Sequence, residues 1–306
     1  MRIGIMIGEG SGAAPGLDGI AARAREAEAK GFATAWMAHI LSFDAISALA
    51  VVGRETSRIE LGTAVVPTYP RHPVVMAQQA LTAQAASRGR FVLGVGLSHQ
   101  IVIEGLLGLS YARRAAHMRE YLEVLGPLLR GEPCDWKGEE YRVQVGVQVP
   151  GATPVPVLVA ALGPKLLEIA ARRAAGTITW MTGPRTLAEH TVPTITAAAR
   201  AAGAPAPRVV AGLPIALVRD AAAARAKAAE VFAIYGQLPS YRAMLDREGA
   251  SGPADVAVAG DERALDAALR RLADAGATDF CAAVYEAEPG AAARTTDYLA
   301  SRVASA

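Results

Sequence analysis

The residues from which most catalytic and metal sites are built are scarce in this sequence of 306 residues. It has two cysteines, Cys134 and Cys281, which lie far apart and have no histidine or cysteine beside them at metal-ligand spacing. None of the five histidines is followed four residues later by another, as in zinc-binding helices. We therefore expect two reduced thiols and no metal centre.

Charge of one sign and long apolar runs are also lacking. The 31 basic and 29 acidic residues leave a net charge of +2, which is too small and too dispersed to predict a nucleic acid or an anionic membrane as a partner. No apolar run approaches the roughly 20 residues of a membrane-spanning helix. Residues 1–8 lack the basic and long apolar regions of a signal peptide and predict a first strand. We expect a cytoplasmic protein whose partner is a small-molecule substrate.

Hydrophobic residues are abundant, and they form a regular alternation of strand-like and helical segments. Hydrophobic residues make up 52% of the chain and aromatic residues only 5%, which is typical of helices packed closely around a sheet. Short β-like runs alternate with amphipathic helical stretches, and this alternation predicts parallel strands. The expected strands cover residues 2–8, 33–38, 59–66, 91–95, 155–160, 177–181, 208–218 and 278–285. The expected helices cover residues 17–30, 44–57, 73–87, 117–129, 164–174, 187–202, 261–275 and 291–303. Eight such units in a chain of this length predict a (β/α)8 barrel, the TIM barrel.

Two segments interrupt this alternation of strands and helices. Residues 132–154 are rich in glycine, proline, valine and polar residues and predict an irregular or hairpin insertion, whereas residues 220–252 carry an additional helical pattern. We expect these insertions over the C-terminal mouth of the barrel, where lids and substrate pockets are built. No linker divides the chain, so residues 1–306 are expected to form a single domain.

A dinucleotide-binding motif is the main alternative for the N-terminal region. Residues 8–13, with glycines at positions 8, 10 and 12, match the pattern G-x-G-x-x-[GA] after a predicted strand. However, Pro15 and Gly16 lengthen the loop before the helix, and the second strand ends at His39 where a ribose-binding acidic residue is expected. We therefore favour a glycine-rich loop at the mouth of a barrel.

Small residues and glycines occur at the ends of four successive strands. They lie in residues 63–67, 94–99, 160–164 and 180–185. Because backbone can approach a flat ligand closely at such residues, and helix N-termini beyond them can bind an anion, the pattern indicates an aromatic ring cofactor. No carboxylate pair or Ser/His/Asp arrangement occurs at these ends, so we expect a bound cofactor to supply the chemistry.

Three segments resemble those of a known family. Residues 61–67 (LGTAVVP), with RHP at 71–73 and AQQ at 77–79, resemble its third strand and the following helix. Residues 87–96 (SRGRFVLGVG) match its pattern S-x-G-R-x-x-L-G-V-G, and residues 180–184 (WMTGP) resemble the sixth strand end of members that use the deazaflavin coenzyme F420. The chain therefore resembles the luciferase-like monooxygenase superfamily, and within it the coenzyme F420-dependent oxidoreductases.

The resemblance implies specific site residues. A non-prolyl cis peptide, aligned to Ala64–Val65, would support the face of the ring, and His39 would lie near the reactive carbon. Arg71 and Arg185 would contact the phosphate or the glutamate tail. His39 and His99 are the candidate catalytic residues, because both can titrate near neutrality. The implied cofactor-binding residues are Thr63, Ala64, Val65, Gly96, Ser98, Ala161, Leu162, Gly163, Thr182, Gly183 and Arg185.

The sequence departs from the sugar-phosphate dehydrogenases of this branch. His99 stands where they have an acidic residue, residues 40–43 (ILSF) replace a tryptophan, and Leu162 stands where a glycine is common. These departures argue against a sugar-phosphate substrate. Phe43, Trp36, Trp180 and Tyr69 instead indicate an apolar pocket, although a place in the barrel core is the alternative for Trp36.

The resemblance predicts an oxidoreductase that transfers a hydride between C5 of coenzyme F420 and a small organic substrate. An FMN-dependent monooxygenase that uses oxygen is the enzymatic alternative, because the superfamily includes such members. A barrel that binds a flavin or deazaflavin without catalysis is the alternative from another class. The resemblance also predicts a homodimer formed through the helices after the second and third strands, where residues 45–52 are apolar.

Overall fold

The computed structural model describes residues 1–8 and 16–303 as a closed barrel of parallel strands. Each strand pairs with the next, and the last pairs with β1, so the sheet closes on itself. The barrel strands are β1 (Arg2–Met6), β2 (Thr34–Met37), β3 (Glu60–Thr63), β5 (Phe91–Gly96), β8 (Val157–Val159), β9 (Gly176–Trp180), β10 (Arg208–Leu217) and β12 (Asp279–Val284). The predicted TIM barrel is confirmed, and the closed sheet is not a doubly wound dinucleotide-binding fold. Residues 9–13 of the glycine-rich motif lie outside the described residues.

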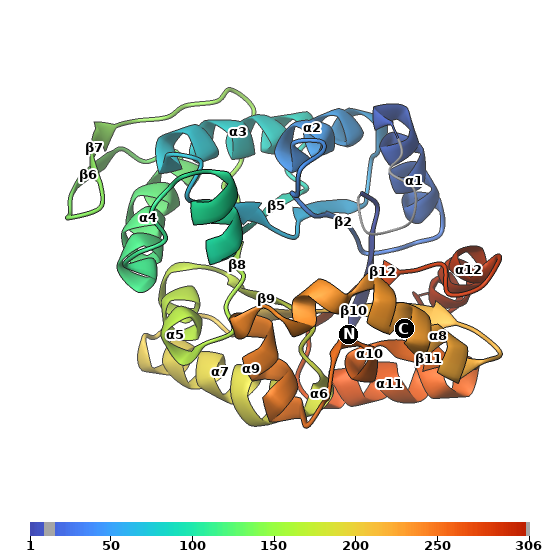
Figure 1. Ribbon diagram of the computed structural model, residues 1–306. Helices are drawn as coiled ribbons and strands as arrows, with labels where there is room; N and C mark the ends of the chain where they lie inside the picture. Colours follow the sequence, from blue (N-terminus) through green and yellow to red (C-terminus); the bar gives the residue numbers. More distant parts are fainter. Residues whose placement is uncertain (9–15, 304–306) are drawn as a thin grey trace.

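Helices form an outer ring around the strands (Figure 1). Their starts follow the capping residues in the sequence: Asp44 accepts a 2.8 Å hydrogen bond from the Ser47 N–H at the start of α2, and Asp261 does the same for Ala264 in α11. The ring comprises α1 (Leu17–Ala29), α2 (Ala45–Glu55), α3 (Pro73–Ala86), α4 (Arg114–Leu129), α5 (Pro164–Arg173), α7 (Val192–Ala201), α11 (Glu262–Asp274) and α12 (Ala291–Val303). Two short segments, α6 (Pro184–Thr186) and η2 (Leu187–Thr191), precede α7.

The insertion at 220–252 lies over the C-terminal mouth, as expected. It contains α8 (Ala221–Val231), η3 (Ala233–Gly236) and α9 (Pro239–Glu248), and it is followed by the short α10 (Pro253–Val256) and β11 (Val258–Gly260), which pairs with β10. A second segment over the mouth, η1 (Ile101–Leu106), follows β5 and was not anticipated from the sequence.

The insertion at 132–154 has a different position from the one expected. It forms the antiparallel hairpin of β6 (Cys134–Lys137) and β7 (Arg142–Val145), which lies outside the barrel beside α3 and α4 (Figure 1). The buried Glu120 carboxylate on α4 accepts hydrogen bonds from the backbone N–H groups of residues 139–141 and so holds the turn of the hairpin. The segment connects a helix to a strand rather than a strand to a helix, and this connection starts at the opposite end of the barrel from the mouth.

The barrel interior is filled around Trp36, which is fully buried, as expected for a core residue. Gly62 on the neighbouring strand gives the indole its space, because a Cβ atom there would lie 2.2 Å from Trp36 Cζ3. Below it, at the N-terminal ends of the strands, Arg208 binds the carboxylates of Glu60 and Asp279. The barrel therefore closes on a partly buried ion network at one end and opens at the other.

Two surface expectations concern partners. No helix in the described ranges, 1–8 and 16–303, has the length and apolar character of a membrane span. Most of the apolar residues at 45–52 are buried inside the subunit, and Val51 on α2 and Val75 on α3 are the large aliphatic residues that these two helices expose. The homodimer stays a prediction.

Candidate active site

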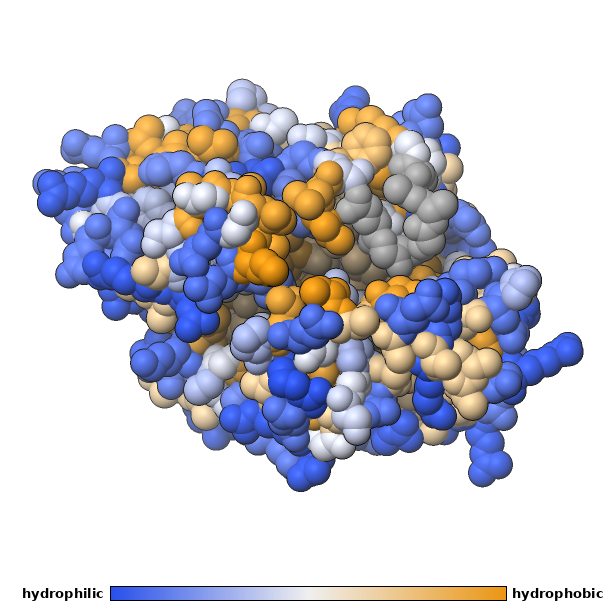
Figure 2. Space-filling model, viewed as in Figure 1, coloured by the Kyte–Doolittle hydropathy of each residue, from blue (hydrophilic) through white to orange (hydrophobic). Residues whose placement is uncertain are grey.

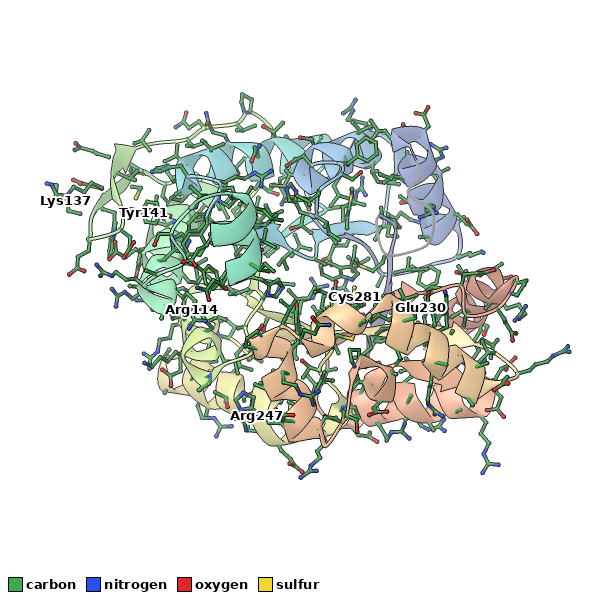
Figure 3. The ribbon with its side chains drawn as sticks, in the orientation of Figure 1. Arg114, Lys137, Tyr141, Glu230, Arg247 and Cys281 are labelled. Atoms are coloured by element: carbon green, nitrogen blue, oxygen red, sulfur yellow. The ribbon has the colours of Figure 1, made fainter. Side chains whose placement is uncertain are left out.

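A wide cavity of about 1590 Å³ opens at the C-terminal ends of the strands. Figure 2 shows the hollow in the middle of the face that carries η1 and α9. Its floor includes Ile178, Gly212 and Cys281, and Figure 3 places Cys281 near the centre of the barrel. Drug-sized ligands occupy pockets of about 300–1,000 Å³, so this cavity has room for a cofactor and a substrate together.

One wall of the cavity is the bulge between β3 and β4 (Val66–Pro67). The peptide bond between Ala64 and Val65 is cis, which confirms the position expected from the family resemblance. Glycines on β5 let the bulge lie close: a Cβ atom on Gly94 would lie 2.0 Å from the Thr63 carbonyl oxygen, and one on Gly96 would lie 2.8 Å from a Val65 methyl group. Together they leave a smooth wall against which a flat ring can lie.

His39 follows β2 and lines the same cavity. Its Nδ1 accepts a hydrogen bond of 3.2 Å from the Ala45 N–H and lies 3.5 Å from the Asp44 carboxylate. Burial opposes ionisation of Asp44, but the hydrogen bond from the Ser47 N–H and the charge of Arg71 hold its pKa below the usual value. Because Nδ1 acts as an acceptor, the proton of the neutral His39 ring is on Nε2.

His99 lies across the mouth, after β5. Its ring packs against Tyr241 from α9, with 5.3 Å between the ring centroids. Burial lowers the pKa of His99, and burial raises the pKa of the Tyr241 hydroxyl. At neutral pH both groups are therefore uncharged hydrogen-bonding groups beside the cavity.

The remaining three histidines have structural contacts and do not line the cavity. The Nδ1 of His72 accepts a hydrogen bond from the first turn of α3. His117 is buried, hydrogen-bonds through Nε2 to the Thr68 hydroxyl, and has its pKa lowered by burial to about 4. His190 Nε2 lies 2.8 Å from the Leu162 carbonyl oxygen.

The structure brings most of the predicted site residues to the cavity. Those that line it are His39, Ala64, Val65, Gly96, Ser98, His99, Leu162 and Gly163, together with Arg71. Thr63, Ala161 and Thr182 are buried beside it, and the Thr63 hydroxyl bridges to the backbone of Gly94. Gly183 and Arg185 contact Glu248 at the start of α6. These five residues, Arg185 among them, are not part of the described lining.

Sequence reasoning missed two groups of lining residues. Arg113, Arg114 and Lys165 bring positive charge to the rim, and Tyr235 and Tyr241 come from the insertion over the mouth. Gly163-Pro164 marks a helix start, which could have pointed to Lys165 in the first turn of α5. The tyrosines belong to no motif, and only the path of the 220–252 segment places them there.

The charged part of the lining is entirely cationic. Arg71, Arg113, Arg114 and Lys165 belong to it, and no Asp or Glu lines the cavity within the described part of the chain. Arg71 is paired with Asp44 and Arg113 with Glu139, whereas Lys165 has no ion pair with another described residue. Figure 3 places Arg114 at the start of α4, on the side of the hollow toward α5. Such a rim attracts an anionic ligand.

Comparisons with known proteins agree with this geometry. The family model described as luciferase-like monooxygenase matches residues 1–299. A 5,10-methylenetetrahydromethanopterin reductase from Methanolobus tindarius is 28% identical over 243 residues, covering 79% of this chain and 74% of the relative. An F420-dependent glucose-6-phosphate dehydrogenase from Nakamurella multipartita is 37% identical over 135 residues, covering 43% of this chain and 40% of the relative, so that match spans less than half of either protein. A solved F420-dependent secondary alcohol dehydrogenase, in complex with an F420–acetone adduct, superimposes with a TM-score of 0.81 at 18% identity, covering 98% of this chain and 97% of that one.

Proposed function

The chain belongs to the luciferase-like monooxygenase family, and from this premise we propose that it is a coenzyme F420-dependent oxidoreductase acting on a small organic substrate. The observation that carries the proposal is the cavity, which joins a smooth wall at Ala64–Val65 to a rim whose charges are all positive among the described residues. Coenzyme F420 combines a flat ring with a long acidic tail. The relative from Nakamurella multipartita is named as F420-dependent, which supports the same cofactor.

The residues present fit this group. The ring would lie against Ala64, Val65 and Gly96, and the acidic tail would extend toward Lys165 and Arg114. When bound, coenzyme F420 supplies or accepts a hydride at C5. FMN ends in a single compact phosphate, which would engage only part of a cationic rim that extends from Arg71 to Lys165.

The protein's own groups would handle the proton that accompanies the hydride. His39 holds a proton at Nε2 while Nδ1 is held by the Ala45 N–H, so the ring is fixed in orientation. His99 and Tyr241 are uncharged hydrogen-bonding groups that can orient a carbonyl or hydroxyl oxygen. The apolar side chains of η3 and α8 over the mouth would exclude water.

Titration of the cofactor-free protein with coenzyme F420 and with FMN, followed by fluorescence, tests the proposal. We expect tight binding of coenzyme F420 and turnover with members of a panel of ketones, enones and alcohols. Tight binding of FMN alone would contradict the proposal in favour of an FMN-dependent monooxygenase. A protein loaded with coenzyme F420 that turns over no member of the panel would instead point to non-catalytic binding.

We expect Lys165→Glu to weaken the binding of coenzyme F420 by about tenfold. At this exposed position the attraction between the lysine and the acidic tail contributes up to about 1 kcal/mol, and the repulsion of a glutamate costs a similar amount. The difference should shrink at high salt, since exposed charges are screened. Titrations at two ionic strengths measure both effects. Lys137→Glu is the matched control, because Lys137 is an exposed lysine on the hairpin that does not line the cavity (Figure 3). Equal affinities of the two variants would remove Lys165 from the tail site.

A further inference from the structure

The lining of the cavity is divided into two sectors around the barrel. The cationic side chains follow three neighbouring strands: Arg71 follows β4, Arg113 and Arg114 follow β5, and Lys165 follows β8. The opposite sector is formed by β10, β12, β1 and β2, which are also neighbours in the sheet. Among the described lining residues of that sector and its loops there is no Lys, Arg, Asp or Glu. Arg114 and Lys165 therefore offer counter-charges for an acidic cofactor tail in one half of the lining, whereas Arg71 is bound to Asp44 in the loop after β2.

The loops of the uncharged sector carry exposed aliphatic side chains at the rim of the cavity. Leu41 is 76% exposed and Ile40 is 51% exposed after β2, and Val231 and Ile234 are 49% and 51% exposed after β10. All four line the cavity, and so does Ile101, which is 64% exposed on η1 and follows β5 in the other half of the lining. Figure 2 shows the hydrophobic surface gathered at the edge of the hollow. Isolated exposed aliphatic residues are ordinary, but a group that converges on one cavity marks a binding surface.

The position of this group favours a ligand inside the cavity over a flat contact with another protein. Its members come from three segments that are far apart in sequence, at residues 40–41, 101 and 231–234, and they surround an opening. His39 immediately precedes Ile40, so the apolar surface begins beside the candidate proton donor. A molecule whose polar group reaches His39 would have its hydrocarbon part against Ile40 and Leu41.

We propose, on the basis of the function proposed above, that the substrate is an uncharged carbonyl compound, or the corresponding alcohol, with an extended hydrocarbon part that lies between residues 40–41 and 231–234. In the reducing direction the carbonyl carbon gains the hydride and the carbonyl oxygen takes a proton from His39 Nε2. When bound, reduced coenzyme F420 would supply the hydride and would release one proton on oxidation, which replaces the proton taken from His39 and balances the step. The alcohol reacts by the reverse of this step.

A series of unbranched methyl ketones, from propanone to undecanone, tests the proposal with reduced coenzyme F420. We expect kcat/KM to increase about fourfold for each added methylene until the chain passes the rim, because each buried methylene contributes a constant transfer free energy. A ketone that ends in a carboxylate should be a poorer substrate than the neutral ketone of equal length, because the sector has no cation to pair with it.

Variants test whether the dependence on chain length comes from the aliphatic residues at the rim of the cavity or from exposed aliphatic residues elsewhere. The double variant Leu41→Ser, Ile234→Ser should lose most of the dependence of kcat/KM on chain length. Val75→Ser is the matched control, because Val75 is an exposed aliphatic residue on α3 that does not line the cavity, and it should keep the full dependence. Turnover that is independent of chain length, or that prefers the carboxylate, would overturn this inference and leave the proposed function standing. Absence of turnover with every ketone and alcohol, despite binding of coenzyme F420, would overturn the proposed function itself.

Discussion

We expect the His39→Ala variant to turn over substrate about 10²- to 10⁴-fold more slowly, the usual contribution of a positioned general acid or base, with little change in the affinity for coenzyme F420. The reason is the fixed orientation of the ring. His39 Nδ1 is occupied by the Ala45 N–H, which leaves Nε2 with the proton at the edge of the cavity. Steady-state kinetics and cofactor titration measure the two quantities separately.

His72→Ala is the matched control for this prediction. Both histidines accept a hydrogen bond through Nδ1 from the first turn of a helix, His39 at α2 and His72 at α3, but only His39 lines the cavity. Each variant loses one hydrogen bond from an N–H group at a helix start, worth about 1 kcal/mol of stability, so this loss is common to both. A His39→Ala enzyme as active as the His72→Ala enzyme would show that His39 has no part in proton transfer.

The second large effect concerns stability. We expect Arg208→Met to lower the free energy of unfolding by about 3–5 kcal/mol, because it leaves a buried carboxylate without its main partner. Arg208 contacts Asp279 at 2.6 Å and Glu60 at 2.7 Å, and the Asp279 side chain is only 3% exposed. Arg2, at 3.6 Å from Asp279, is too distant to replace a hydrogen-bonded pair. Denaturant unfolding monitored by circular dichroism measures the change.

A surface arginine provides the control. Arg302 also binds an aspartate, Asp266, but both side chains are about one third exposed, so Arg302→Met should cost about 0–1 kcal/mol. The double variant Arg208→Met, Asp279→Leu should recover much of the stability, since no buried charge is left unpaired. If Arg208→Met lowered the free energy of unfolding no more than Arg302→Met does, the ion network of Arg208, Glu60 and Asp279 would make no special contribution to stability.

Some residues of the candidate site could be predicted from the sequence, and others could not. The bulge at Ala64–Val65 and His39 come just after strands and Gly96 ends one, so short motifs with a known strand position were enough to place them. Lys165 and Tyr241 escaped prediction for different reasons. Lys165 is one charged residue among many in helix first turns, and Tyr241 comes from an insertion whose path across the mouth depends on packing rather than on local pattern.

The position of the hairpin at 132–154 could not be predicted from local sequence pattern either. Its composition predicted an irregular or hairpin segment, and a hairpin is present, but its place beside α4 depends on the long-range bonds to Glu120. Composition and turn chemistry act over a few residues, whereas the position of a connection depends on which end of the barrel it leaves.

Periodicity and capping residues were sufficient for the strands and helices of the barrel, because these depend on neighbours close in the chain, and the family resemblance placed the cavity wall at Ala64–Val65. The tertiary structure alone determined the division of the mouth into a cationic and an apolar sector. Barrel closure makes β10, β12, β1 and β2 one half of the ring and places the loops after β10 and β2 around the same cavity as Arg114 and Lys165. Residues separated by nearly two hundred positions, such as Leu41 and Ile234, become neighbours of one cavity only when the sheet closes on itself.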